Sequence, residues 1–228
     1  MSNFDIVKEY EAQETFRVKS LMSKFDLQTN LIKEQFTGKI DLPKTWNIGL
    51  IVGRSGTGKT TIAKEIFKQE YIKSMDYKDC SIIDAMPKNK TINEITEIFN
   101  RTGFSSPPSW LKPYHVLSNG EKMRVDIART ILEDRNMIVF DEFTSVVDRE
   151  VAKITSYALQ KCIRKQETKF VAVSCHYDII DWLLPDWIFN TDTMTFIEGT
   201  KKKDQKLSLK YTAQNIRTSG ECLLNITI

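Results

Sequence analysis

The chain has 228 residues, of which 41% are hydrophobic and 28% charged, which indicates a folded globular protein rather than a disordered one. Its 33 basic and 30 acidic residues leave a net charge of only +3, too small to predict a nucleic-acid or membrane partner. The apolar runs are short, whereas a membrane-spanning helix needs roughly 20 apolar residues. The four cysteines lie far apart and the polar start has no secretory leader, so we expect a cytoplasmic protein without direct membrane insertion.

The start of the chain has weaker patterns than the rest. Residues 1–15 are polar and charged, and we expect a helix-prone or frayed extension there. Residues 16–21 and 36–40 have the composition of antiparallel strands. The main domain is therefore expected to span residues 16–198, with an antiparallel β flank at its start.

A phosphate-binding loop follows the first continuously apolar run, residues 49–52, and precedes a helical stripe over residues 62–67. It fits G-x-x-x-x-G-K-[ST], in which glycines let backbone N–H groups turn around phosphate oxygens and the helix start adds a positive dipole. We expect Lys59 to reach the β and γ phosphates and Thr60 to ligate Mg²⁺. The predicted nucleotide-binding residues are Gly53, Ser55, Gly56, Thr57, Gly58, Lys59, Thr60 and Thr61. Kinases and GTPases also use this loop, so it predicts the ligand and not the reaction.

A small helical lobe is predicted over about residues 88–135, after a strand at residues 80–85. One helix is expected at residues 92–99, and a loop at residues 105–110, where two prolines oppose a helix. A second helix carries an apolar stripe over residues 123–132. Ser118 precedes it, with Glu121 three residues later, which is the pattern of a helix N-cap.

Two adjacent acids end the next apolar run, residues 137–140. At the carboxyl end of a buried strand, Asp141 is suited to hold Mg²⁺ and Glu142 to accept a proton from an attacking water. The alternative is a solvated turn after the strand. A third apolar run, residues 170–173, precedes His176, which by itself fits a strand cap as well as a phosphate contact. Apolar strands that alternate with helices indicate an α/β fold with a mostly parallel sheet.

The tail, residues 199–228, is rich in lysine and has strand-like runs at residues 206–211 and 223–228. We expect it to pack on the preceding domain as a solvated edge strand. A contact with a nucleic-acid backbone is the alternative.

Four further motifs distinguish among the proteins that use a phosphate loop. They are Leu117-Ser118-Asn119-Gly120-Glu121, the strand that ends in Asp141-Glu142, Thr144-Ser145-Val146-Val147-Asp148, and His176. In order and spacing they resemble the signature motif, the Walker B strand, the D-loop and the switch histidine of ABC (ATP-binding cassette) ATPases. The resemblance covers about residues 16–196 and implies a P-loop NTPase fold of ABC type with a shortened helical lobe.

The resemblance also implies roles for single residues. Ser118 and Gly120 would contact the γ-phosphate of an ATP bound to a second copy, so that ATP holds a homodimer together. Asp148 would lie at the nucleotide, and His176 would sense the γ-phosphate. For adenine stacking the position of Phe25 is similar, with Phe36 as the competing candidate and a plain core phenylalanine as the alternative.

The sequence departs from the family at several positions. No glutamine corresponds to the Q-loop glutamine of transporters, and Asp84 or Asn89 is the expected substitute. Only 58 residues, 60–117, separate Lys59 from Ser118, which leaves a lobe shorter than the one that transporter subunits use. Phe143 stands where the family commonly has a proline, and the signature has Asn119 and Glu121 instead of glycine and glutamine.

We therefore expect a Mg²⁺-dependent ATPase that forms an ATP-sandwich dimer and acts on a soluble nucleic-acid or protein partner. The alternatives are the ATP-binding motor subunit of a membrane transporter and an ATP-gated interaction switch with little turnover. A phosphotransferase is a more distant possibility, because a kinase has no use for the signature motif or for Asp148.

Overall fold

A computed structural model describes residues 2–68, 70–72 and 75–199. The described residues form two compact units, a larger one over Lys39–Gly199 and a smaller one over Asn3–Gly38. The lysine-rich runs at residues 206–211 and 223–228 lie outside the described residues, and the boundaries predicted for the ATPase domain stay predictions.

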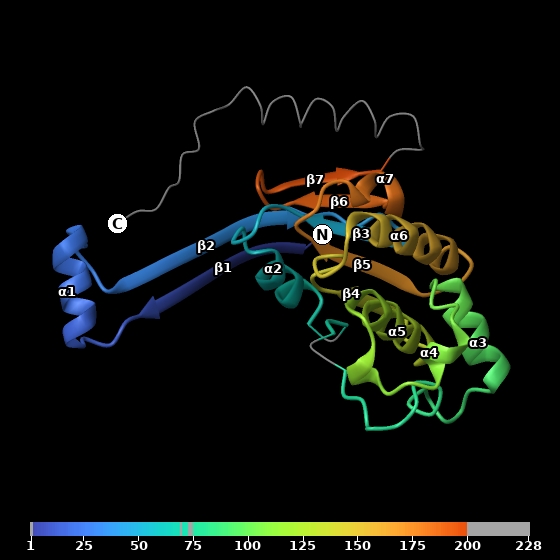
Figure 1. The fold of residues 1–228 in the computed structure, drawn as a ribbon. Coiled ribbons are helices and arrows are strands. Elements are labelled where there is room, and N and C mark those ends of the chain that lie inside the picture. The colour runs from blue at the N-terminus through green and yellow to red at the C-terminus, as the bar shows by residue number, and fades with distance from the viewer. Residues whose placement is uncertain (1, 69, 73–74, 200–228) are drawn as a thin grey trace. The chain divides into compact units, whose positions relative to one another are not determined.

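The larger unit is built on a five-stranded sheet with the strand order β4-β5-β3-β6-β7 (Figure 1). The first four strands in this order are parallel, and β7 is antiparallel to β6. The three apolar runs of the sequence are confirmed as β3, β4 and β5, and all five residues of β3 are buried. The strands are β3 (Ile48–Val52), β4 (Met137–Phe140), β5 (Lys169–Ser174), β6 (Trp187–Asn190) and β7 (Thr195–Glu198). A mostly parallel sheet with its central strand covered on both faces confirms the predicted α/β fold.

Helices connect the strands of this sheet. The helix α2 follows the phosphate loop and packs on β3 and β5, while α3 packs on α5 and α6. The helices are α2 (Lys59–Ile66), α3 (Ile92–Arg101), α4 (Pro107–Trp110), α5 (Asn119–Leu132), α6 (Arg149–Ile163) and α7 (Ile179–Leu183). The helices predicted at residues 92–99 and 123–132 are therefore confirmed as parts of α3 and α5.

Two predictions for the segment before α5 were wrong. Residues 80–85 form turns, in which only Ser81 makes an isolated bridge, to Pro113. The proline-containing segment does contain a short helix, α4, which begins at Pro107. Proline is tolerated in the first turn of a helix because the N–H groups there have no partner within the helix.

The smaller unit consists of β1 (Ser2–Glu11), α1 (Phe16–Phe25) and most of β2 (Leu31–Ile40), and Figure 1 draws the two strands in opposite directions. The strand predicted at residues 36–40 is confirmed within β2. The strand predicted at residues 16–21 was wrong: Thr15 caps a helix there by accepting a hydrogen bond from the Val18 amide at 3.3 Å. The extension predicted as helix-prone or frayed is mostly the strand β1.

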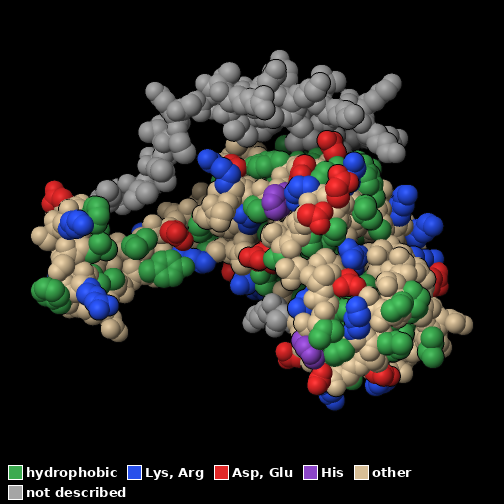
Figure 2. Space-filling view, in the orientation of Figure 1, with side chains coloured by type: hydrophobic (Ala, Val, Ile, Leu, Met, Phe, Trp, Pro, Cys, Tyr) green, Lys and Arg blue, Asp and Glu red, His purple; other side chains and the backbone are tan. Residues whose placement is uncertain are grey.

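No residue of α1 is buried. Phe16 and Phe25 have 85% and 61% of their surface exposed, and Figure 2 shows hydrophobic side chains on the surface of this unit. The two candidates for adenine stacking therefore differ in environment. Phe25 is exposed on α1, whereas Phe36 is buried in β2, which favours a core role for Phe36. The adenine contact of Phe25 stays a prediction.

Candidate functional site

The phosphate loop joins the buried strand β3 to α2, as the sequence predicts. Gly56 and Gly58 both have φ of 82°, a left-handed conformation that residues with a Cβ rarely adopt. A Cβ added to Gly53 would lie 2.1 Å from Oγ1 of Thr191, so the chain passes too close for a side chain. These glycines give the loop the tight path that lets backbone N–H groups turn toward an anion.

Residues after β6 support the loop, and sequence reasoning did not find them. Oγ1 of Thr191 lies 2.6 Å from Oγ1 of Thr57. The Asp192 carboxylate accepts a hydrogen bond from the Arg54 amide at 3.1 Å, and Tyr177 donates to its other oxygen at 2.6 Å. These contacts join segments more than 130 residues apart in the chain, and no motif marks them.

Lys59 curls back over the loop at the start of α2. Its Nζ donates a hydrogen bond of 2.6 Å to the carbonyl oxygen of Arg54. Hydrogen bonds between an ammonium group and a phosphate are stronger than those to a neutral carbonyl. Lys59 is therefore placed to exchange this carbonyl for a phosphate oxygen.

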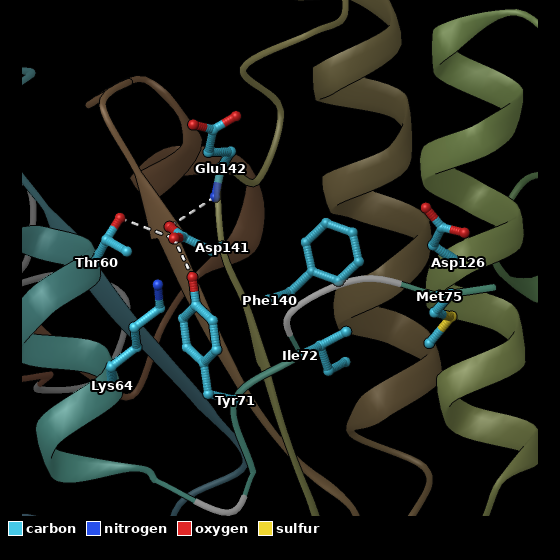
Figure 3. Close-up of a pocket in the computed structure, with 9 residues that line it drawn as sticks. All are labelled: Thr60, Lys64, Tyr71, Ile72, Met75, Asp126, Phe140, Asp141 and Glu142. Atoms are coloured by element: carbon cyan, nitrogen blue, oxygen red, sulfur yellow. Dashed lines mark hydrogen bonds between the residues drawn. The ribbon is translucent and has the colours of Figure 1, made fainter.

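The predicted metal ligands Thr60 and Asp141 meet at the carboxyl end of the sheet (Figure 3). Thr60 donates a hydrogen bond of 2.8 Å to Oδ2 of Asp141, and the Glu142 amide donates one of 2.8 Å to Oδ1. Tyr71 donates a third, of 2.5 Å, to Oδ2. A hydroxyl beside one carboxylate fits Mg²⁺, which prefers oxygen ligands and completes its shell with substrate phosphates and water.

A cavity of about 390 Å³ opens beside this cluster. One end is polar, with Thr60, Lys64, Asp141 and Glu142, and the other contains Phe140 and Asp126. The remaining lining residues are Tyr71, Ile72 and Met75. In Figure 3 the Glu142 carboxylate is turned away from that of Asp141. The cavity therefore offers room for a small molecule such as water next to both predicted acids.

Glu142 and Thr144 are held in an uncommon backbone conformation. Their φ angles are 51° and 66°, in the left-handed region that a β-branched residue such as Thr144 strongly disfavours. Strain of this kind is retained where the surrounding structure enforces it, commonly at functional sites. Phe143 between them provides such a constraint, because its amide donates to the Val173 carbonyl at 2.8 Å and its side chain is fully buried.

Phe143→Pro, the change toward the residue common in ABC ATPases, is expected to destabilise this chain. It removes the hydrogen bond to Val173 and a ring that packs on Phe140 and Phe170. Losing a buried phenylalanine side chain costs about 3–5 kcal/mol. Thermal unfolding measures the effect, with Phe143→Leu as the control that keeps the amide donor. A melting temperature for the proline variant equal to that of wild type would show that the Phe143 contacts are dispensable.

His176 lies two residues beyond β5, whose last residue, Ser174, pairs with Val52 of β3. This register places His176 at the same edge of the sheet as the phosphate loop. Burial lowers the pKa of His176, and the positive charge of Arg149 lowers it further, while Asp178 opposes the shift. Burial and Arg149 thus favour the neutral form of the imidazole.

The signature residues lie at the start of α5. Ser118 caps the helix and forms a capping box with Glu121, whose carboxylate also accepts a hydrogen bond of 2.7 Å from Ser109. These bonds hold the pKa of Glu121 below its usual value, Ser109 contributing most. A Cβ on Gly120 would lie 3.1 Å from Val151, in the first turn of α6. Asp148 caps α6 by accepting a hydrogen bond from the Val151 amide. The predicted signature and D-loop residues are thus close together, and within one copy Ser118 and Asp148 serve as helix caps.

Neither substitute proposed for the Q-loop glutamine lies at the Asp141 cluster. Asp84 accepts a 2.5 Å hydrogen bond from Ser81, and Asn89 is exposed. The Asp141 cluster contains Tyr71 instead. Sequence reasoning missed Tyr71 because it precedes no motif and reaches Asp141 across 70 positions of the chain.

Comparisons with known proteins indicate the family and the fold of this chain. The NB-ARC domain family model matches residues 28–167. Energy-coupling factor transporter ATP-binding protein EcfA1 of Caldanaerobacter subterraneus subsp. tengcongensis is 25% identical over 67% of this chain and 69% of its own length. Lactococcin-G-processing and transport ATP-binding protein LagD of Lactococcus lactis is 26% identical over 68% of this chain, which spans only 29% of that protein.

Solved structures show the same fold. The ATP-binding cassette MJ0796, in a dimeric structure of a post-hydrolysis state bound to ADP and Pi, has a TM-score of 0.57 and 13% identity over 82% of this chain and 92% of its own. A bacterial Atm1-family ABC exporter with ATP bound has a TM-score of 0.56 and 17% identity over 83% of this chain and 38% of its own. Across the residues that the structure describes, no helix is both long and apolar enough to span a bilayer.

Proposed function

Because this chain belongs to the NB-ARC domain family and is a P-loop ATPase domain with the motifs and fold of the ABC type, we propose that it hydrolyses ATP as a pair of copies that close on the nucleotide. The observation that carries this proposal is the cluster of Thr60, Asp141 and Glu142 beside the phosphate loop, with an open cavity next to it. The site therefore combines a loop that can bind the phosphates, two oxygen ligands for a metal ion, and an acid beside a cavity with room for water.

Each group of the cluster has a role in the proposed reaction. The loop amides and Lys59 bind the phosphates, and Thr60 with Asp141 would hold Mg²⁺, which neutralises charge on the transferred phosphoryl group. Glu142 orients the attacking water and takes its proton on a carboxylate oxygen. His176 donates a hydrogen bond from one ring nitrogen to the γ-phosphate.

The pairing of two copies is supported by the start of α5. Ser118 and Gly120 present a helix N-terminus, which attracts a phosphate. Asp148 lies in the same region, because Gly120 approaches the first turn of α6. The MJ0796 cassette, which shares the fold, is described as dimeric.

We propose that hydrolysis in this chain is coupled to a soluble nucleic-acid or protein partner. The short stretch of 58 residues, 60–117, supports this because it leaves little surface for a membrane partner. A motor subunit of a transporter is the second candidate, and the printed names of EcfA1 and LagD favour it. An ATP-gated switch differs from both only in its low turnover.

Steady-state ATP hydrolysis with Mg²⁺, with and without DNA or RNA, tests the proposal, with Glu142→Gln as the blank. Hydrolysis above the blank is expected, and stimulation by nucleic acid that weakens with salt would identify a nucleic-acid partner. Hydrolysis without stimulation would reject nucleic acid. Hydrolysis equal to the blank under every condition would contradict the ATPase mechanism.

A further inference from the structure

Tyr71 is held by two elements beside the proposed metal site. Its ring lies under the Lys64 ammonium, with Nζ 5.0 Å from the ring centroid. Its backbone forms an isolated parallel bridge to Val139, with hydrogen bonds of 3.1 Å from the Ile72 amide to the Val139 carbonyl and from the Val139 amide to the Glu70 carbonyl. A side chain held by α2 and by the outer edge of β4 at once has little freedom to turn its hydroxyl elsewhere.

The hydroxyl of Tyr71 contacts the oxygen that Thr60 also contacts. Both donate to Oδ2 of Asp141, at 2.5 Å from Tyr71 and 2.8 Å from Thr60. With the Glu142 amide on Oδ1, the Asp141 carboxylate accepts three hydrogen bonds. The Asp141 carboxylate is therefore held in one orientation.

A purely structural role explains Tyr71 less well. Its side chain is only half-buried and lines the 390 Å³ cavity with Asp141 and Glu142. The chain also contains a second contact of this kind, away from Thr60 and Asp141: Tyr77 and Tyr114, whose rings stack at 4.0 Å, each donate a 2.8 Å hydrogen bond to Asp126. That pair binds a carboxylate on α5, whereas Tyr71 binds the carboxylate of the reaction site.

We propose that Tyr71 is a positioning residue of the ATPase site, whose hydroxyl holds the Asp141 carboxylate beside Thr60, the two groups that would hold Mg²⁺. The inference rests on the proposed function, because it assumes that Asp141 and Thr60 hold the metal of a bound ATP. Groups that orient a metal ligand in this way commonly change metal affinity about 10- to 100-fold when they are removed.

The test is Tyr71→Phe, which removes the hydroxyl and keeps the ring under Lys64. Binding of a fluorescent ATP analogue is titrated with Mg²⁺ in the Glu142→Gln background, so that the readout is binding and not turnover. We expect the Mg²⁺ concentration at half-saturation to rise at least about 10-fold, with affinity in EDTA changed by less than about twofold. Tyr114→Phe is the matched control, because it removes the same atom from a carboxylate contact at Asp126.

The outcomes separate this inference from the proposed function. If the Glu142→Gln parent shows no Mg²⁺-dependent binding, the proposed function fails and the inference fails with it. If the parent responds to Mg²⁺ and Tyr71→Phe responds identically, only the inference is overturned. An equal loss in Tyr71→Phe and Tyr114→Phe would also overturn it, since the effect would then be general. Thermal unfolding of both variants checks that each remains folded.

Discussion

Replacing Glu142 with glutamine is expected to lower the rate of ATP hydrolysis by about 100- to 10,000-fold while ATP affinity stays close to that of wild type. The side-chain amide of glutamine has the shape of the carboxylate but accepts no proton from the attacking water. Glu142 is exposed at the mouth of the cavity. Its backbone amide, which donates a hydrogen bond to Asp141, is unchanged by the substitution. The local structure and the proposed metal site should therefore survive.

Two measurements make this prediction specific. Single-turnover hydrolysis reports the chemical step, and equilibrium binding of ATP reports affinity. Glu97→Gln is the control, because Glu97 is a carboxylate of α3 paired with Arg101 at 2.6 Å and has no place in the mechanism. Turnover by Glu142→Gln within a few-fold of wild type would show that another group accepts the proton.

The sequence predicts the parts of the site that are formed by residues adjacent along the chain. The loop from Gly53 to Thr60 is continuous, and its glycines are required by local backbone geometry. The strands β3, β4 and β5 are buried on both faces, so their apolar runs stand out without any knowledge of the partners. Asp141 and Glu142 follow directly from the end of β4.

The parts that the sequence does not predict depend on long-range contacts or on competing periods. Tyr71 and Asp192 reach the site from distant segments, and their spacing has no pattern. In α1 the apolar residues Val18 and Met22, and Leu21 and Phe25, lie four positions apart, which is a helical spacing, although the composition of residues 16–21 predicts a strand. A residue type in isolation was therefore a poorer guide than its spacing.

Replacing Ser118 with aspartate is expected to abolish the ATP-dependent dimer while the monomer stays folded. Aspartate caps a helix as well as serine does, so the start of α5 keeps an acceptor for the Glu121 amide. The added negative charge would face the γ-phosphate of the ATP on the partner copy, and juxtaposed like charges at an interface cost several kcal/mol. We expect the dissociation constant of the dimer to rise by at least about 100-fold.

Light scattering with ATP and Mg²⁺ in the Glu142→Gln background measures this constant directly. The chain provides a matched control in Thr91, which caps α3 through the same capping box with Glu94. Thr91→Asp makes the same chemical change at a helix start that is not expected to meet ATP, so its dimer should match the parent. If Ser118→Asp dimerises as tightly as Thr91→Asp, the start of α5 does not bind the partner's nucleotide. The two copies would then have to associate through another surface, because a charge placed against a phosphate cannot be neutral to binding.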